Sequence, residues 1–180
     1  MRKKINLIVI ILLCLFVTGC KPRKNFETKI ESSSYADRQM IVPSDFNVNG
    51  TGELMCRADA TGPENSTVDI AYNIIYKNGN IKSLQSLNRI KTIDKEVLDT
   101  YYNSYVGIAK NYNGLKYYET LVEREDDSVS YNIFIDYDKI DVDKLLEIEG
   151  KEDNIIVNGK ANLDEWLHFA EKFGILCEEV

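Results

Sequence analysis

The feature that most limits how this chain can fold is the alternating run at residues 67–77. Every second side chain in this run is large and apolar, which is typical of a strand with one buried face. Asn78-Gly79 follows directly, and this pair favours a tight β-hairpin because both residues tolerate positive φ. Residues 81–91 should therefore return antiparallel beside the run, and residues 53–59 should add an earlier strand. The three strands are predicted to form a meander.

A long helix is predicted after this meander. It should begin at Thr92 or Asp94, because the apolar stripe that follows has spacings of three and four residues. Asn113-Gly114 should end the helix, since glycine readily adopts the left-handed conformation of a helix stop. The stripe consists of Val97, Tyr101, Tyr105, Ile108 and Tyr112.

The remaining elements are shorter. Two strands are predicted at residues 115–123 and 129–137, followed by a short helix capped by Asp141. Residues 155–157 are a candidate short strand, and Asn162 should cap a final helix. The predicted order is β-β-β-α-β-β-α-(β)-α. This is an α+β fold, a largely antiparallel sheet with helices packed on one face.

The first twenty residues have the order of a bacterial lipoprotein signal. A cationic start at residues 1–4 precedes an apolar run at residues 5–17, which is short for a membrane span but suits a signal peptide. Val17-Thr18-Gly19-Cys20 then resembles a lipobox, in which the cysteine thiol accepts diacylglycerol. We expect a signal peptide at residues 1–19 and a lipid anchor, with palmitate, on Cys20. The alternatives are an uncleaved anchor helix or a secretory signal cleaved elsewhere.

The rest of the chain divides into a tether and one domain. Residues 20–51 lack sustained periodicity and are predicted to form the lipidated start and a tether. Residues 52–180 are close to the commonest domain size and are predicted to form one α+β domain. Hydrophobic residues make up 44% and charged residues 28%, which is typical of a globular protein. The net charge of 22 − 29 = −7 argues against a nucleic-acid partner.

Several segments resemble those of small uncharacterised bacterial lipoproteins, the YehR-like family. Besides the lipobox, they are Gly52-Glu53-Leu54-Met55-Cys56, residues 135–141, and Gly174-Ile175-Leu176-Cys177. The resemblance implies an α+β fold and a location in the cell envelope. It implies no activity, and it carries over no functional residue beyond Cys20.

The cysteines point to one disulfide. Cys14 lies in the predicted signal and Cys20 is the predicted lipid acceptor, which leaves Cys56 and Cys177. An even pair in an exported domain favours a disulfide, here from the first strand to the end of the last helix. Two buried thiols remain an alternative. So does a redox-active pair, although such pairs usually have the spacing Cys-x-x-Cys.

Two groups of residues are candidates for catalysis or metal binding. Asp136, Asp138, Asp141 and Asp143 lie within eight residues, but their spacing fails the EF-hand pattern. The simpler interpretation is a strand end, an exposed turn and a helix cap. His168 is the only histidine, so no multi-histidine metal site can form. We predict no catalytic residue, no metal site and no cofactor.

Tyrosine is unusually frequent, with eleven residues. Tyrosines suit exposed recognition of peptides or sugars, but they also suit packing of a helix on a sheet. If a surface binds a partner, the sequence favours the neighbourhood of Tyr102 and Tyr118.

These observations favour a membrane-anchored bacterial lipoprotein exposed on the extracytoplasmic side of the cell membrane. Its leading functional interpretation is a non-catalytic binding or interaction module, with an envelope protein or glycan as partner. One alternative is a small envelope enzyme that uses the carboxylates of residues 136–141. Another is a purely structural envelope protein.

Overall fold

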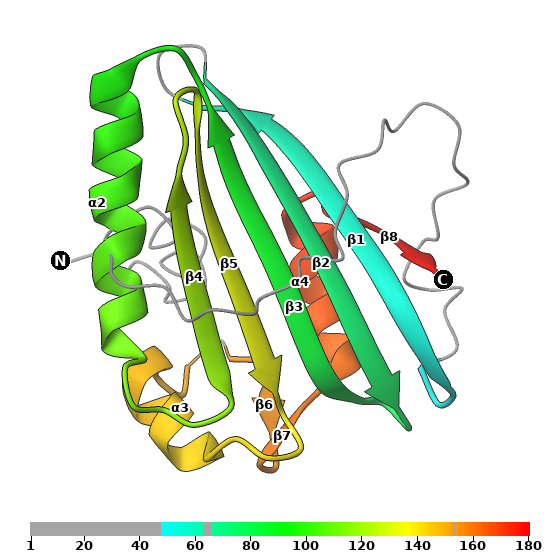
Figure 1. Ribbon diagram of the computed structural model, residues 1–180. Helices are drawn as coiled ribbons and strands as arrows, with labels where there is room; N and C mark the ends of the chain where they lie inside the picture. The colour runs from blue at the N-terminus through cyan, green and yellow to red at the C-terminus, as the bar shows by residue number, and fades with distance from the viewer. Residues whose placement is uncertain (1–47, 63–65, 153) are drawn as a thin grey trace, which may run out of the picture.

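The computed structural model describes residues 48–62, 66–152 and 154–180. These residues build a six-stranded antiparallel sheet, order β4-β5-β3-β2-β1-β8, and three helices, which confirms the α+β fold (Figure 1). The sheet strands are β1 (Thr51–Thr61), β2 (Thr67–Lys77), β3 (Asn80–Lys91), β4 (Tyr118–Arg124), β5 (Ser128–Asp136) and β8 (Leu176–Glu179). The other elements are α2 (Lys95–Asn111), α3 (Val142–Glu149), α4 (Leu163–Lys172) and a small hairpin of β6 (Ile156–Val157) and β7 (Lys160–Ala161).

The predicted meander is confirmed. β1 and β2 pair antiparallel over their whole lengths, and β2 pairs with β3 with one irregularity, next to Ile75. Asn78 (φ 52°) and Gly79 (φ 72°) form the tight turn between β2 and β3, as their tolerance of positive φ predicts. The alternating apolar side chains of β2 all face one side of the sheet and are buried there.

The chain leaves the meander through α2 and returns as a second hairpin. Asp94 caps α2: its Oδ1 accepts hydrogen bonds from the backbone N–H of Glu96 (2.9 Å) and Val97 (3.2 Å). β5 then pairs with β3, and β4 forms the edge of the sheet beyond β5. β4 begins at Tyr118 rather than at residue 115, because Gly114 (φ 91°) is followed by a turn.

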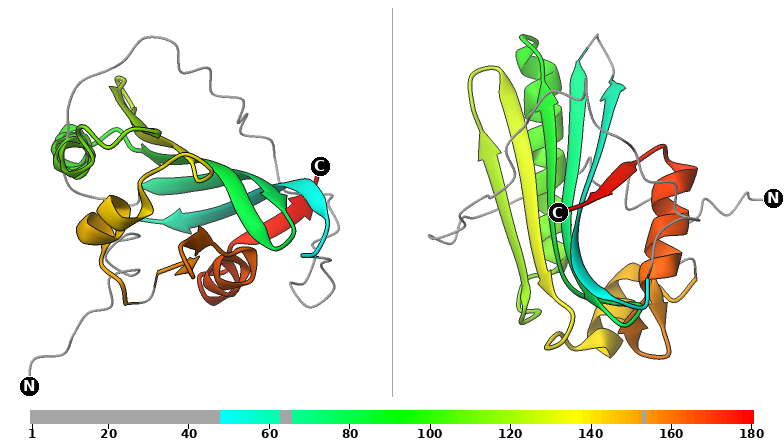
Figure 2. Two further views of the ribbon diagram at one scale, coloured as in Figure 1. Left: turned by 90° about the horizontal axis from the view of Figure 1, so that it is seen from below. Right: turned by 90° about the vertical axis from the view of Figure 1, so that its right-hand side faces the viewer.

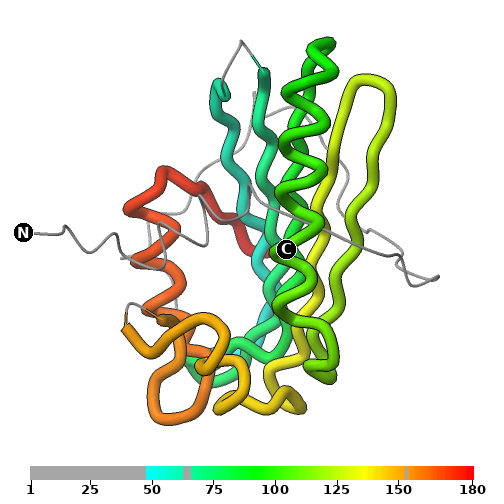
Figure 3. Tube along the Cα trace, turned by 90° about the vertical axis from the view of Figure 1, so that its left-hand side faces the viewer, coloured from blue at the N-terminus to red at the C-terminus, as the bar shows by residue number. Residues whose placement is uncertain are grey.

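All three helices lie on one face of the curved sheet, as predicted (Figure 2). α2 packs on β4 and β5, where the rings of Tyr105 and Tyr131 stack with centroids 5.2 Å apart. α4 packs on β2, where Trp166 meets Tyr72 edge to face at 5.2 Å. Figure 3 shows α2 over one side of the sheet and α4 over the other, with α3 and the β6–β7 hairpin at the end where α2 stops and α4 starts. The core therefore lies between this helix layer and the sheet.

The end of the chain differs from the prediction. Instead of ending with the final helix, the chain turns at Gly174 (φ 66°) and forms β8, which pairs antiparallel with β1. A strand of four residues is too short to give a periodic pattern, so only pairing with β1 defines it. The candidate strand at residues 155–157 is confirmed as β6, and it pairs with β7, a strand of two residues that the sequence did not predict.

Candidate functional site

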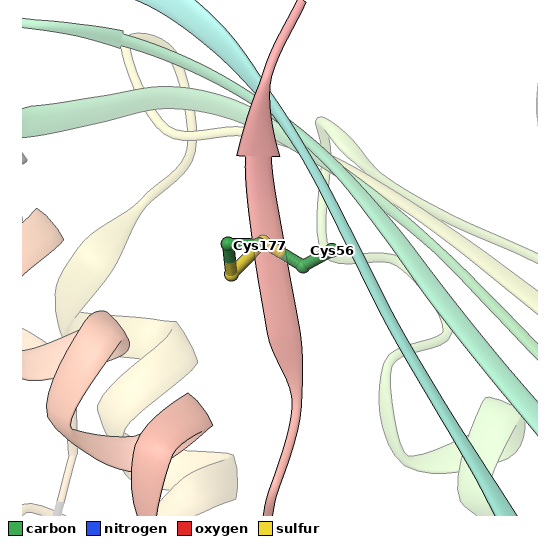
Figure 4. The surroundings of a disulfide bond; sticks show 2 residues. All are labelled: Cys56 and Cys177. Carbon is green, nitrogen blue, oxygen red and sulfur yellow. A yellow bond between two sulfur atoms is a disulfide. The ribbon is translucent and has the colours of Figure 1, made fainter. Parts of the chain in front are cut away.

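The predicted disulfide is present. Cys56 on β1 and Cys177 on β8 are directly opposite in the strand register, and their sulfur atoms are bonded (Figure 4). The bond therefore joins two adjacent strands, not a strand and a helix as the sequence suggested. It fastens the short edge strand β8 to the sheet, across a sequence separation of 121 residues.

A second contact holds β8 from the helix-covered face. The hydroxyl of Tyr76, on β2, donates a hydrogen bond of 2.8 Å to Oε1 of Glu179, on β8. Gly52 lies opposite Tyr76 on β1, and a Cβ there would come within 2.6 Å of the Tyr76 hydroxyl. Tyr76 can reach across β1 because Gly52 has no side chain. Burial, with help from Glu179, raises the pKa of Tyr76 to about 12, so the hydroxyl remains a donor at neutral pH.

The predicted tyrosine surface is wrong for Tyr118. This side chain is only 8% exposed and its ring stacks on that of Tyr112, the residue directly after α2, with centroids 4.0 Å apart. Tyr102 is half-buried and packs against the core. Tyr117 is the exposed tyrosine here, at 46%, with the ammonium of Lys139 5.7 Å from its ring centroid. The alternative of helix-on-sheet packing therefore describes Tyr102, Tyr112 and Tyr118, because their rings pack in or against the core between helix and sheet.

Glu149 is a carboxylate within the same tyrosine cluster. Tyr112 donates its hydroxyl hydrogen to Oε1 of Glu149 at 3.2 Å, and the side-chain amide of Asn154 donates to Oε2 at 3.2 Å. Burial raises the pKa of Glu149 above its ordinary value, and these two hydrogen bonds partly oppose that shift. The contacts attach the end of α3 to α2, which is a structural role.

The acidic residues around α3 are also engaged in structural contacts. Asp136 pairs with Lys139 (2.5 Å) and Asp138 with Lys82 (2.7 Å). Asp141 caps α3 by accepting the backbone N–H of Lys144 at 3.2 Å, as predicted, and its pKa is lowered by its contacts with Lys144. In the part of the chain that the structure describes, no group of three or more histidine, cysteine or acidic side chains could hold a metal ion.

Two other positions named from the sequence are His168 and Cys20. His168 is exposed on α4, with Nδ1 3.9 Å from Oε2 of Glu171. Cys20, the predicted lipid acceptor, lies outside the described residues, as do the signal peptide and most of the tether. Within the described ranges, no helix is long and apolar enough to cross a membrane.

The surface that the sequence did not reveal lies on the other side of the sheet and at its edge. The three helices leave this face uncovered; Ala71 and Leu87 form a small apolar cluster there, separate from the main core. Ile75 (45% exposed) and Leu176 (37% exposed) lie on the same face. Next to Leu176, β1 extends beyond β8 and leaves Ala58–Thr61 as a free strand edge among the described residues. Only the strand register could reveal this edge, because β8 has no sequence signal.

Comparisons with known proteins bear on the fold. No family model matches the chain, and no curated protein matches it. The NMR structure of the Escherichia coli YehR protein is similar, with 16% identity and a TM-score of 0.50 over 73% of this chain and 94% of that one. An NMR structure of a Streptococcus pneumoniae protein has 12% identity and a TM-score of 0.44 over 89% of this chain and 100% of that one. The similarity to YehR supports a YehR-like fold for this chain and shows the fold alone.

Proposed function

We propose that this chain is a membrane-anchored lipoprotein of the bacterial cell envelope, and that its folded part is a non-catalytic binding or interaction module on the extracytoplasmic side. The observation that carries the proposal is the disulfide between Cys56 and Cys177. Structural disulfides persist in oxidising compartments and are rare in the cytosol. This agrees with the order of residues 1–20, in which charge, apolar run and cysteine match a lipoprotein signal.

The anchor would act through the thiol of Cys20. Each buried CH₂ group of an acyl chain contributes about 0.8 kcal/mol to membrane binding, and a single chain holds a protein only marginally. Diacylglycerol on Cys20 supplies two chains, enough for stable attachment. The module would then work at the membrane surface without a transmembrane helix.

The non-catalytic reading rests on what the candidate groups do. Asp136 and Asp138 are paired with lysines, and Asp141 caps a helix. Each of these carboxylates therefore already has a structural contact.

The uncovered sheet face and the edge of β1 are the surfaces most suited to binding another protein. Exposed backbone groups can form hydrogen bonds with an added strand, and exposed apolar side chains can be buried by a partner.

The anchor is tested by membrane fractionation and intact mass of the natural product. Wild-type protein should fractionate with membranes and carry acyl chains on an N-terminal Cys20. Cys20→Ala should lose both properties, whereas Cys14→Ala, the matched control within the signal, should keep them. An intact initiator methionine, or a wild-type form that begins after residue 20, would contradict the anchor.

The binding function is tested by crosslinking in envelope fractions with the full-length protein. Saturable capture of a protein or glycan supports it, and capture should be lost when the disulfide is reduced and the domain unfolded. Turnover of an envelope substrate that disappears in Asp136→Asn would instead support the enzyme alternative.

A further inference from the structure

The strand next to the edge strand β8 is only partly covered by it. β1 spans Thr51–Thr61, but β8 pairs only with Leu54–Arg57. The last part of β1, Ala58–Thr61, has β2 on one side and no strand on the other among the residues that the structure describes. In Figure 1, β8 lies beside the middle of β1, and β1 continues past it toward the β1–β2 loop.

The backbone groups on this edge can be assigned from the pairing. The C=O of Glu53 accepts a hydrogen bond of 3.0 Å from the N–H of Val180, so the peptide groups of Glu53 face β8. Backbone groups alternate sides along a strand, so those of Asp59 and Thr61 also point outward. Ala58 and Ala60 direct theirs to β2. The edge therefore presents two N–H and two C=O groups in the spacing that an added strand requires.

Natural proteins usually protect such an edge with charged side chains, most often lysine, or with proline, a bulge or a covering element, and Asp59 is the one charged side chain of this segment. The segment Ala58–Thr61 contains no proline or lysine, and β1 pairs with β2 without a register shift. Its side chains are small, so an incoming strand would meet little steric hindrance. The opposite edge of the sheet is β4, against which α2 packs.

The charge at the edge indicates which partner would bind. Asp59 is directly opposite Asp69 on the same face, a like-charge pair that is unfavourable. Asp69 has a cationic partner, Lys91 Nζ at 2.8 Å, whereas the exposed Asp59 has none among the described residues. Residues 48–180 carry 14 lysines and arginines and 25 acidic residues, so the net charge is 14 − 25 = −11. A second copy would bring the same charge, whereas a basic segment would be attracted.

We propose that the outer edge of β1 at Ala58–Thr61 binds an extended, basic segment of another envelope protein as an added strand in line with β8. The backbone of the segment would pair with Asp59 and Thr61. A lysine or arginine of the segment would lie beside the Asp59 carboxylate. This inference rests on the binding function proposed above and names its partner class.

The probe is a synthetic peptide, acetyl-Val-Thr-Lys-Thr-Val-amide, added to ¹⁵N-labelled full-length protein in detergent solution. Saturable amide shifts are expected at Ala58–Thr61, at Thr67–Asp69 on the neighbouring strand, and at the start of β8. A peptide with glutamate in place of lysine should bind at least about tenfold more weakly, because it places like charge beside Asp59.

Protein variants separate the backbone from the charge. Asp59→Pro removes the backbone N–H of residue 59 but breaks no hydrogen bond to β2, because this N–H points away from β2. Proline is tolerated at such positions of a strand. Asp59→Pro should weaken binding at least about tenfold. Asp59→Asn keeps the N–H and should weaken binding less, while reducing its dependence on salt. A peptide N-methylated at its lysine tests the same backbone pairing with unaltered protein.

Four results would overturn the edge proposal: no saturable binding at millimolar peptide, shifts located on another surface, unchanged affinity of Asp59→Pro, or unchanged affinity of the N-methylated peptide. If the peptide fails while crosslinking still captures a saturable envelope partner, the edge proposal falls and the binding function stands. If crosslinking captures nothing, the binding function falls with it.

Discussion

Cys56 and Cys177 face each other across neighbouring antiparallel strands, with Cα atoms 4.0 Å apart. Because Glu53 accepts the N–H of Val180, the alternation along β1 makes this a non-hydrogen-bonded pair, the type in which side chains approach most closely. The disulfide thus sits where two strands bring their side chains together. It helps to retain β8, a strand of only four residues.

Removing the disulfide should destabilise the domain. Cys56→Ser with Cys177→Ser is expected to lower the free energy of unfolding by about 2–5 kcal/mol, because the bond closes a loop of more than one hundred residues in the unfolded chain. Denaturant unfolding measures the loss, and hydrogen exchange should be fastest in β8. Wild-type protein under reducing conditions is the control and should match the variant. Equal midpoints for oxidised and reduced wild type would contradict this prediction.

Gly52 should not tolerate a side chain. A Cβ would come within 2.6 Å of the Tyr76 hydroxyl, so Gly52→Ala should displace the ring and break its hydrogen bond to Glu179. We expect a loss of about 1–3 kcal/mol in the free energy of unfolding. Tyr76→Phe is the control: it removes the hydroxyl alone and should cost about 1 kcal/mol. If Gly52→Ala has wild-type stability, Gly52 is not required for this contact.

Glu149 should make stability depend on pH in an unusual direction. Burial raises its pKa above 4.5, so the folded protein holds this proton more tightly than the unfolded chain. The contribution of Glu149 to the free energy of unfolding therefore increases as pH falls through the raised pKa toward 4.5. It is lost as pH rises through the raised pKa. Glu149→Gln, which keeps an acceptor for Tyr112, should stabilise the protein at neutral pH, with an advantage that shrinks on acidification.

Urea midpoints from pH 8 down to about 4.5 check this prediction for Glu149. Glu147→Gln is the matched control, since Glu147 is exposed on the same helix. Parallel profiles for wild type and Glu149→Gln would show that the carboxylate is not responsible.

The N-terminal cap of α2 should make a measurable contribution to the stability of the protein. Asp94→Ala removes the acceptor of two backbone N–H groups and should lower the free energy of unfolding by about 1 kcal/mol. Asp94→Asn keeps a capping oxygen and should lose less. Thermal and denaturant unfolding of wild type and the two variants measure these losses. If Asp94→Ala is as stable as wild type, the cap does not contribute to the stability of the protein.

Tyr118 should behave as a core residue. Tyr118→Ala leaves a cavity beside Tyr112 and is expected to cost about 3–5 kcal/mol of stability. Tyr117→Ala, one residue earlier and exposed, should cost less than about 1 kcal/mol. A small effect at Tyr118 with a loss of partner binding would restore the sequence-based interpretation of this position as part of a surface.

Local patterns in the sequence determined most of the elements. Alternation and Asn78-Gly79 predicted the β2–β3 hairpin, and Asp94, Asp141 and Asn162 predicted the starts of the helices. These signals are reliable because they depend on backbone preferences and on hydrogen bonds between near neighbours. The disulfide partners followed from counting cysteines, without any knowledge of geometry.

Only the tertiary structure decided the position of β8, the burial of Tyr118 and the free edge at Ala58–Thr61. Each depends on which distant strand or helix lies alongside, and no local pattern records that. A four-residue strand has no period of its own, and a tyrosine has the same sequence signal whether its ring faces solvent or a helix. The pairing of β8 and the burial of the tyrosine ring are both set by contacts between segments that are far apart in the chain. Burial and strand pairing depend on neighbours in space, not on neighbours in sequence.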